Sequence, residues 1–223
     1  MKSELHFMPL RILIGASMKK TAVAMGGLLA AGGALGQTIG FDTETPGTLP
    51  AACVQGVTGK GAPRWAVRQD ASAPSAPNVL QQSGSGTFPW CVLRSSSLEN
   101  GYVEVKFKSL AGKEDQAGGV VWRWKDGDNY YVARANALES NVSLYYTANG
   151  RRNTLKYVDA PVPPNVWHTL RVEFARSQIR VALNGKTYID LIDTHIEGTG
   201  AVGLWTKADS VTAFDDFAYG SAR

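Results

Sequence analysis

The chain of 223 residues contains only two cysteines and three histidines. Two cysteines are too few for a zinc site by themselves, and neither has a histidine near it in sequence. The glycine signatures of phosphate loops and dinucleotide-binding strands are missing, as is the G-x-S-x-G turn of many serine hydrolases. These absences argue against zinc, nucleotide and serine-hydrolase sites.

The charge balance gives no sign of a nucleic-acid partner. The chain has 23 Lys and Arg against 19 Asp and Glu, a formal net charge of +4. Residues 1–36 hold four of those basic residues and one of the acidic ones, so the rest of the chain is nearly neutral. A nearly neutral domain does not indicate nucleic-acid binding.

Residues 1–36 have the layout of a bacterial secretory signal. From Met18 onward, two lysines precede a short apolar run and an A-x-G cleavage pattern that ends at Gly36. The run is short for a membrane span, and no cysteine follows it to carry a lipid anchor. We predict a signal peptide over residues 1–36, with Met1 or Met18 as the start; the alternative is a helix that belongs to the fold. A single domain over residues 37–223 would then be periplasmic or secreted, with no membrane span after cleavage.

Export would place Cys53 and Cys91 in an oxidising compartment. We predict a structural disulfide between them, with free thiols as the alternative. On the chain-entropy view such a bridge stabilises the fold by up to ~4 kcal/mol.

After the leader, apolar and polar residues alternate with period two, and no long stretch has helical periodicity. Turn pairs such as Asp126-Gly127, Asn149-Gly150 and Asn184-Gly185 separate the runs. About a dozen short strands in one domain predict an all-β fold, a two-sheet antiparallel jelly-roll sandwich. Residues 71–86, rich in Ser, Pro and Ala, are predicted to be a surface loop or linker.

The alternation also predicts which side chains share a face of each strand. One face is aliphatic throughout. In residues 118–125 the pattern places Trp122 and Trp124 on one side and Arg123 on the other. The face opposite the aliphatic one then gathers polar and aromatic residues: Arg123, Tyr130, Arg134, Ser143 and Tyr145.

Several motifs carry a family resemblance: GGVVWRWKDGDNYYVARA, PNVWHTLRVEF, IRVALNGK and GAVGLWTKADSVTAFDDF. In this order they resemble the concanavalin A-like lectin/glucanase superfamily, which includes LamG-like domains. More closely, the chain is similar to an exported bacterial family named for 3-keto-disaccharide hydrolases, over residues 41–219. The resemblance implies a jelly roll whose concave sheet often holds a glycan. Because unrelated functions share this scaffold, it implies the fold more strongly than the activity.

A concave face with rings and arginines suits a sugar, since rings meet the C–H side of a pyranose and arginines fork hydrogen bonds to hydroxyl groups. We therefore predict a carbohydrate ligand. The alternative for each residue is that the rings pack in the core and the arginines pair with carboxylates. The predicted ligand-binding residues are Arg123, Tyr130, Arg134, Tyr145, Trp205 and Lys207.

Three functions stay open from the sequence: a carbohydrate-binding domain, a glycoside hydrolase acting on a 3-keto disaccharide or an oligosaccharide, and an envelope protein-interaction module. Hydrolysis ordinarily needs two carboxyl groups. The related laminarinase-type enzymes carry an E-x-D-x-x-E strand, which this chain lacks. Its candidate carboxylates are scattered, so the sequence favours binding over catalysis and assigns no catalytic residue: Glu104, Glu139, Glu173, Asp190 and Asp209.

The last predicted strand places Asp215 and Asp216 between two phenylalanines. In glucanase-type jelly rolls an aspartate on the last strand meets backbone oxygens of the first strand around a structural calcium. That resemblance implies a calcium site at Asp216 and Asp42. The alternative is a β-bulge that turns both phenylalanines inward while an aspartate binds neighbouring N–H groups.

Overall fold

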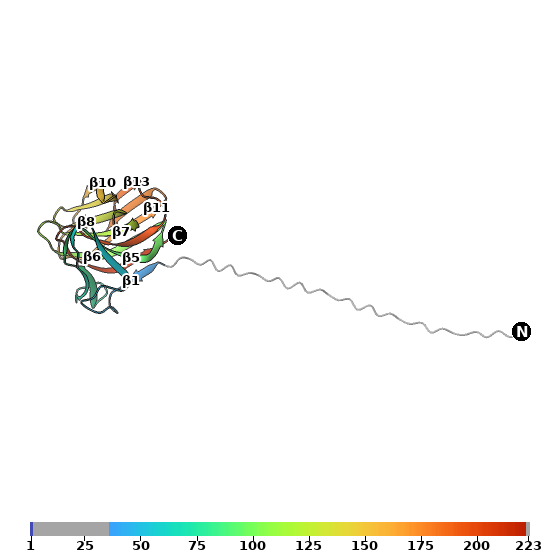
Figure 1. The fold of residues 1–223 in the computed structure, drawn as a ribbon, viewed down its shortest axis with the longest axis horizontal. Helices are drawn as coiled ribbons and strands as arrows, with labels where there is room; N and C mark the ends of the chain where they lie inside the picture. Colours follow the sequence, from blue (N-terminus) through green and yellow to red (C-terminus); the bar gives the residue numbers. More distant parts are fainter. Residues whose placement is uncertain (2–35, 222–223) are drawn as a thin grey trace. The chain divides into compact units, whose positions relative to one another are not determined.

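The computed structural model describes Met1 and residues 36–221 of the chain. Within that part every regular element is a β-strand, and the strands form two antiparallel sheets (Figure 1). No helix of the described residues is long and apolar enough to cross a membrane. The predicted signal peptide, including Met18, falls almost wholly outside the described residues.

The first sheet has eight strands. Strand β1 (Gln37–Ile39) pairs with β15 beside the main path. The other seven follow in spatial order: β13 (Lys186–Ile192), β12 (Gln178–Leu183), β11 (His168–Ala175), β6 (Gly101–Ala111), β15 (Val211–Gly220), β4 (Asn78–Gln82) and β3 (Trp65–Gln69).

The second sheet has seven strands. Their spatial order is β10 (Arg151–Asp159), β9 (Asn141–Ala148), β8 (Asn129–Asn136), β7 (Ala117–Asp126), β14 (Gly200–Trp205), β5 (Ser85–Leu98) and β2 (Cys53–Ala62). Neighbours that are distant in sequence, such as β14 beside β7 and β5, give the crossed connections of a jelly roll.

The main core lies between the two sheets and is built from the aliphatic face that the alternation predicted. Val103, Val105 and Phe107 of β6 are fully buried there. Trp122 stacks on Tyr131 of the same sheet, with ring centroids 5.3 Å apart. The predicted all-β jelly-roll sandwich is confirmed.

The predicted disulfide is also confirmed. Cys53 of β2 and Cys91 of β5 are bonded, with their Cα atoms 5.8 Å apart. Both lie in the main core, so the bridge links β2, at the edge of the sheet as described, to the neighbouring strand β5.

The predicted loop over residues 71–86 is wrong in its second half. Strand β4 lies there, and its Val79 and Leu80 are buried. This short apolar run is a strand because it pairs with β15 on one side and with β3 on the other. The sequence did not indicate this strand because the Ser, Pro and Ala residues around it, which belong to the neighbouring turns, dominate the composition of the stretch.

The aspartate pair of the last strand sits at a β-bulge. The register of β15 against β6 shifts between Asp215 and Ala218, so Phe214 and Phe217 both enter the core. The Asp215 carboxylate accepts hydrogen bonds from the Ser75 backbone N–H at 2.8 Å and from the N–H of Asp216 at 2.8 Å. The bulge alternative is therefore the one that the structure shows.

Candidate functional site

A second buried cluster lies on the face of the seven-stranded sheet that points away from the main core. It alternates with core residues along each strand: Tyr130 with Tyr131, and Tyr145 with Leu144. We call these rings the aromatic cluster: Trp90, Trp124, Tyr130, Tyr145 and Trp205.

The seven-stranded sheet is strongly curved around this cluster. Arg152 of the edge strand β10 has its guanidinium carbon 4.6 Å from the ring centre of Phe88 on β5. Strands β10 and β5 are five steps apart in the sheet, which would be about 24 Å if the sheet were flat. Thr58 of the opposite edge bonds to the Tyr130 hydroxyl on β8 at 2.7 Å. The curved face is thus concave, and side chains from distant strands meet inside it.

Arg152 lies over the aromatic cluster. Its guanidinium is 4.2 Å from the ring centre of Tyr145 and 5.8 Å from that of Trp205. Such cation–π contacts hold the group in place. Among the described residues Arg152 forms no ion pair, and its buried Nη1 atom has no hydrogen-bond partner. Burial lowers the pKa of Arg152.

A network of charged side chains adjoins the aromatic cluster. The fully buried Arg134 donates from Nη1 to Asp115 at 3.1 Å and from Nη2 to Glu139 at 2.5 Å. Lys207 also pairs with Asp115, at 2.5 Å. Tyr157 donates to Glu139 at 3.1 Å and accepts from Arg134 at 2.9 Å. We call these five residues the polar network.

The loop that carries Asp115 is held by Asp209. One carboxylate oxygen of Asp209 accepts the backbone N–H of Lys113 at 2.7 Å, and the other accepts those of Glu114 and Asp115 at 3.0 Å each. These hydrogen bonds hold the pKa of Asp209 below its ordinary value, because they favour the ionised carboxylate. Asp209 therefore holds the loop that places Asp115 in the polar network.

Glu139 is the accessible carboxylate of the polar network, with its side chain 37% exposed. Burial acts to raise the pKa of Glu139, but the hydrogen bond from Asn141 and the charge of Arg134 outweigh it and leave the pKa lowered. Burial raises the pKa of the neighbouring Tyr157 phenol to about 12. At neutral pH the pair is thus an ionised carboxylate beside a protonated phenol.

A hollow of about 410 Å³ opens between the polar network and the rim of the sheet. Arg152 and Lys207 face it from the network side, and Phe88 and Lys60 from strands β5 and β2. We call it the Arg152 hollow. It is large enough for a small ligand and combines a ring, cations and hydroxyl groups, as binding pockets commonly do.

Five of the six predicted ligand residues share this concave face. Tyr130, Tyr145 and Trp205 belong to the aromatic cluster, and Arg134 and Lys207 to the polar network. Of these, Lys207 alone faces the hollow. The rings of Tyr145 and Trp205 lie beneath Arg152 and are almost fully buried, so they offer no open surface for a sugar.

Arg123 does not join this face, and the predicted alternation of β7 is wrong from that residue onward. Arg123 has a φ of 46°, and the register of β7 shifts after Trp122. The shift puts Trp124 in the aromatic cluster, not in the main core. Arg123 instead donates to the backbone carbonyl oxygens of Ile196 at 2.9 Å and Glu99 at 3.2 Å. Arg123 therefore connects β7 to the loop that contains Ile196 and to the bend that contains Glu99.

Sequence reasoning missed Asp115, Arg152 and Tyr157. Residues five apart in a regular strand face opposite sides, yet Arg152 and Tyr157 share the concave face because β10 has a bulge between Thr154 and Lys156. Asp115 stands in an irregular loop where periodicity gives no signal. Asp209 holds the loop of Asp115, but the two residues are far apart in sequence, so the sequence did not connect them.

The predicted calcium residues do not fit a cation site. The Asp216 carboxylate pairs with the ammonium group of Lys106 at 2.7 Å, which already supplies positive charge. The Asp42 carboxylate accepts the backbone N–H of Asn78 at 3.0 Å. Within residues 36–221 no group of three Asp, Glu, His or Cys side chains is placed to hold a metal ion.

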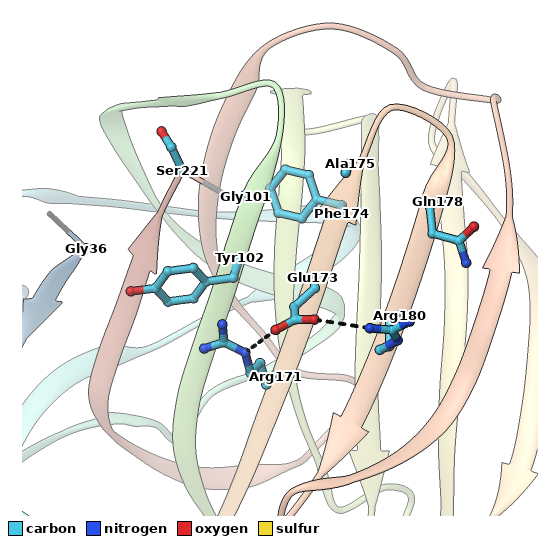
Figure 2. Close-up of a pocket in the computed structure, with 10 residues that line it drawn as sticks. All are labelled: Gly36, Gly101, Tyr102, Arg171, Glu173, Phe174, Ala175, Gln178, Arg180 and Ser221. Carbon is cyan, nitrogen blue, oxygen red and sulfur yellow. Dashed lines mark hydrogen bonds and ion pairs between the residues drawn. The ribbon is translucent and has the colours of Figure 1, made fainter. Parts of the chain in front are cut away.

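A larger hollow, of about 580 Å³, lies on the eight-stranded sheet (Figure 2). Its charges are already paired: Glu173 accepts from Arg171 at 2.9 Å and lies 3.7 Å from Arg180. Arg171 also covers the ring of Tyr102, with 4.1 Å between its guanidinium carbon and the ring centre. Because these groups satisfy one another, the Arg152 hollow is the stronger candidate site.

Solved structures of low sequence identity share this fold. The carbohydrate binding module CBM66 from Bacillus subtilis matches with a TM-score of 0.63 at 20% identity, over 75% of this chain and 95% of that one. The cellulose induced protein Cip1 matches with a TM-score of 0.62 at 12% identity, over 84% and 98%. A putative glycosyl hydrolase from Parabacteroides distasonis matches with a TM-score of 0.51 at 19% identity, over 71% and 90%.

The sequence also matches the model of one protein family. The model of the 3-keto-alpha-glucoside-1,2-lyase-like domain matches residues 58–218, which include both the aromatic cluster and the polar network. No curated protein matches the chain.

Proposed function

Because the chain belongs to the family of 3-keto-alpha-glucoside-1,2-lyase-like domains, we propose that it binds a carbohydrate in the Arg152 hollow. The observation that carries the proposal is the guanidinium of Arg152, which lines the hollow, lies over the rings of Phe88 and Tyr145, and forms no ion pair with any described residue. Arg152 is only partly buried, and a sugar hydroxyl or ring oxygen in the hollow would accept a hydrogen bond from its guanidinium.

The other groups around the hollow suit the same ligand. Lys207 supplies a second cationic donor, and Phe88 supplies a partly buried ring at the rim, stacked on Trp205 at 5.6 Å. The fold supports the proposal too, since one of the similar structures is named as a carbohydrate binding module. An exported location, which the residues before Gln37 predict, would bring the domain to extracellular glycans.

Replacing Arg152 by alanine tests the proposal. A hydrogen bond to a charged group contributes about 1.5–3 kcal/mol, so we expect Arg152→Ala to weaken binding at least tenfold. Glycan arrays would find the ligand, and titration calorimetry would then compare the variants. Arg151→Ala is the matched control, because Arg151 is the exposed neighbour on the same strand. Equal affinities of wild type and Arg152→Ala would contradict the proposal.

A lyase acting on 3-keto glycosides is the second candidate, and the state of Glu139 favours it. A ketone at C3 makes the hydrogen on C2 acidic, so a carboxylate that is ionised at neutral pH can remove it. As the C1–O bond breaks, the leaving oxygen would take a proton from the Tyr157 phenol, and Arg152 would lie against the charge of the enolate. Hydrolysis by a general acid would instead need a carboxyl group with a raised pKa, which Glu139 does not have.

The lyase candidate predicts a product with a C1=C2 double bond conjugated to the C3 ketone, which absorbs ultraviolet light. We expect the wild type to generate this absorbance from a 3-keto glycoside and Glu139→Gln to slow it about 100-fold. Glu173→Gln, on the other sheet, should keep the wild-type rate. A wild type without activity on 3-keto glycosides, or an active Glu139→Gln, would exclude this chemistry at Glu139.

A further inference from the structure

The charges that line the Arg152 hollow are unequal. Among the residues that the structure describes, Lys60, Arg152 and Lys207 bring three positive charges to its walls, and Glu114 brings one negative charge. Lys60 and Glu114 are exposed, so water solvates their charges. Arg152 and Lys207 are the cations that lie deeper.

The polar network accounts for Lys207 but not for Arg152. Arg134 and Lys207 balance Asp115 and Glu139, with two positive and two negative charges in direct contact. Arg152 takes no part in any ion pair within the described residues. The formal charges of Lys60 and Glu114 at the rim also cancel, which leaves one positive charge over, on Arg152.

A partly buried cation without a counterion is an unusual arrangement in a folded protein. Removing a charge from water is costly unless the charge is paired and hydrogen-bonded. The three rings under Arg152 stabilise the cation in part, and burial still lowers its pKa. A neutral sugar could accept the free hydrogen bond but would leave the charge uncompensated.

We propose that the Arg152 hollow takes a saccharide that carries one negative charge, a carboxylate of a uronic acid or a sulfate ester. This inference rests on the proposed function and adds the class of ligand. The anionic group would pair with the Arg152 guanidinium, and the sugar ring would extend toward Phe88 and Lys207. Both groups offer oxygen atoms that a planar guanidinium can bind in pairs.

The test is an array on which each neutral disaccharide stands beside its uronic acid and its monosulfate. We expect the acidic member of at least one set to bind about tenfold more tightly than its neutral partner. Whether the uronic acid or the sulfate gives the gain identifies the anionic group. Arg152→Gln should remove the advantage, Arg152→Lys should keep part of it, and Arg151→Gln should keep all of it. Thermal unfolding of each variant confirms that it folds.

The outcomes separate this inference from the proposed function. If neutral and acidic partners bind equally well, or if Arg152→Gln keeps the preference, the anionic ligand is wrong while carbohydrate binding stands. If no saccharide binds to the wild type, both proposals are wrong.

Discussion

Replacing Asp115 by alanine is expected to cost about 3–5 kcal/mol of folding free energy, because it removes the buried counterion of Arg134 and leaves that guanidinium only the partly exposed Glu139. Both side chains of the Arg134–Asp115 pair are 0% exposed. Asp115 also accepts hydrogen bonds from Asn136 at 2.9 Å and from Lys207 at 2.5 Å, so one substitution removes the centre of a buried network. Denaturant unfolding of wild type and variant gives the difference directly.

Glu114 provides the matched control for this substitution. It precedes Asp115 in the same loop and also donates its backbone N–H to Asp209, but its side chain is exposed. We expect Glu114→Ala to change the free energy of unfolding by less than about 0.5 kcal/mol. Equal effects at the two positions would mean that the loop backbone, not the buried charge, determines stability.

Removing the disulfide is expected to have an effect of similar size. Cys53 and Cys91 are 38 residues apart, and closing a loop of that length stabilises the folded state by about 4 kcal/mol on the chain-entropy view. The double variant Cys53→Ala/Cys91→Ala should lose this amount in denaturant unfolding. Alanine is the suitable replacement because both positions are buried in the main core, where serine would bury a hydroxyl group.

The wild type itself supplies the comparison for the disulfide. Unfolding it in the presence of a reducing thiol should give the same loss as the double variant, since the constraint on the unfolded chain is removed in both cases. A loss of less than about 1 kcal/mol in both experiments would contradict the expected role of the bridge.

Alternation along single strands predicted most of the concave face. In β8 and β9 it placed Tyr130, Arg134 and Tyr145 opposite the core residues, and the structure agrees, because both strands pair in regular register. The same reasoning failed in β7, where one extra residue relative to β14 reverses the faces, and a bulge of the same size lies in β10. In β7 alternation placed Arg123 on the concave face, which is wrong. In β10 alternation gave no indication that Tyr157 and Arg152 share a face.

The role of the rings changed for a different reason. The sequence predicted Tyr145 and Trp205 as open surfaces for a sugar, but Arg152 covers both. That contact joins strand β10 to strands β9 and β14 across the curved sheet. The curvature is a property of seven paired strands together, and no local pattern in any one of them specifies it.

By itself the sequence determined the all-β jelly roll, the disulfide between Cys53 and Cys91, and the division of side chains between two faces. The fold and the two faces follow from period two and from turn chemistry, which act over a few neighbouring residues, and the disulfide follows from the presence of two cysteines in a chain with an export signal. The tertiary structure alone decided that Arg152 lines a hollow without an ion-pair partner among the described residues and that Asp115, Glu139 and Arg134 form one network. Asp115 and Glu139 stand in a loop and a turn, where alternation gives no signal, and Arg152 reaches the ring of Phe88 across five strand spacings because the whole sheet is curved.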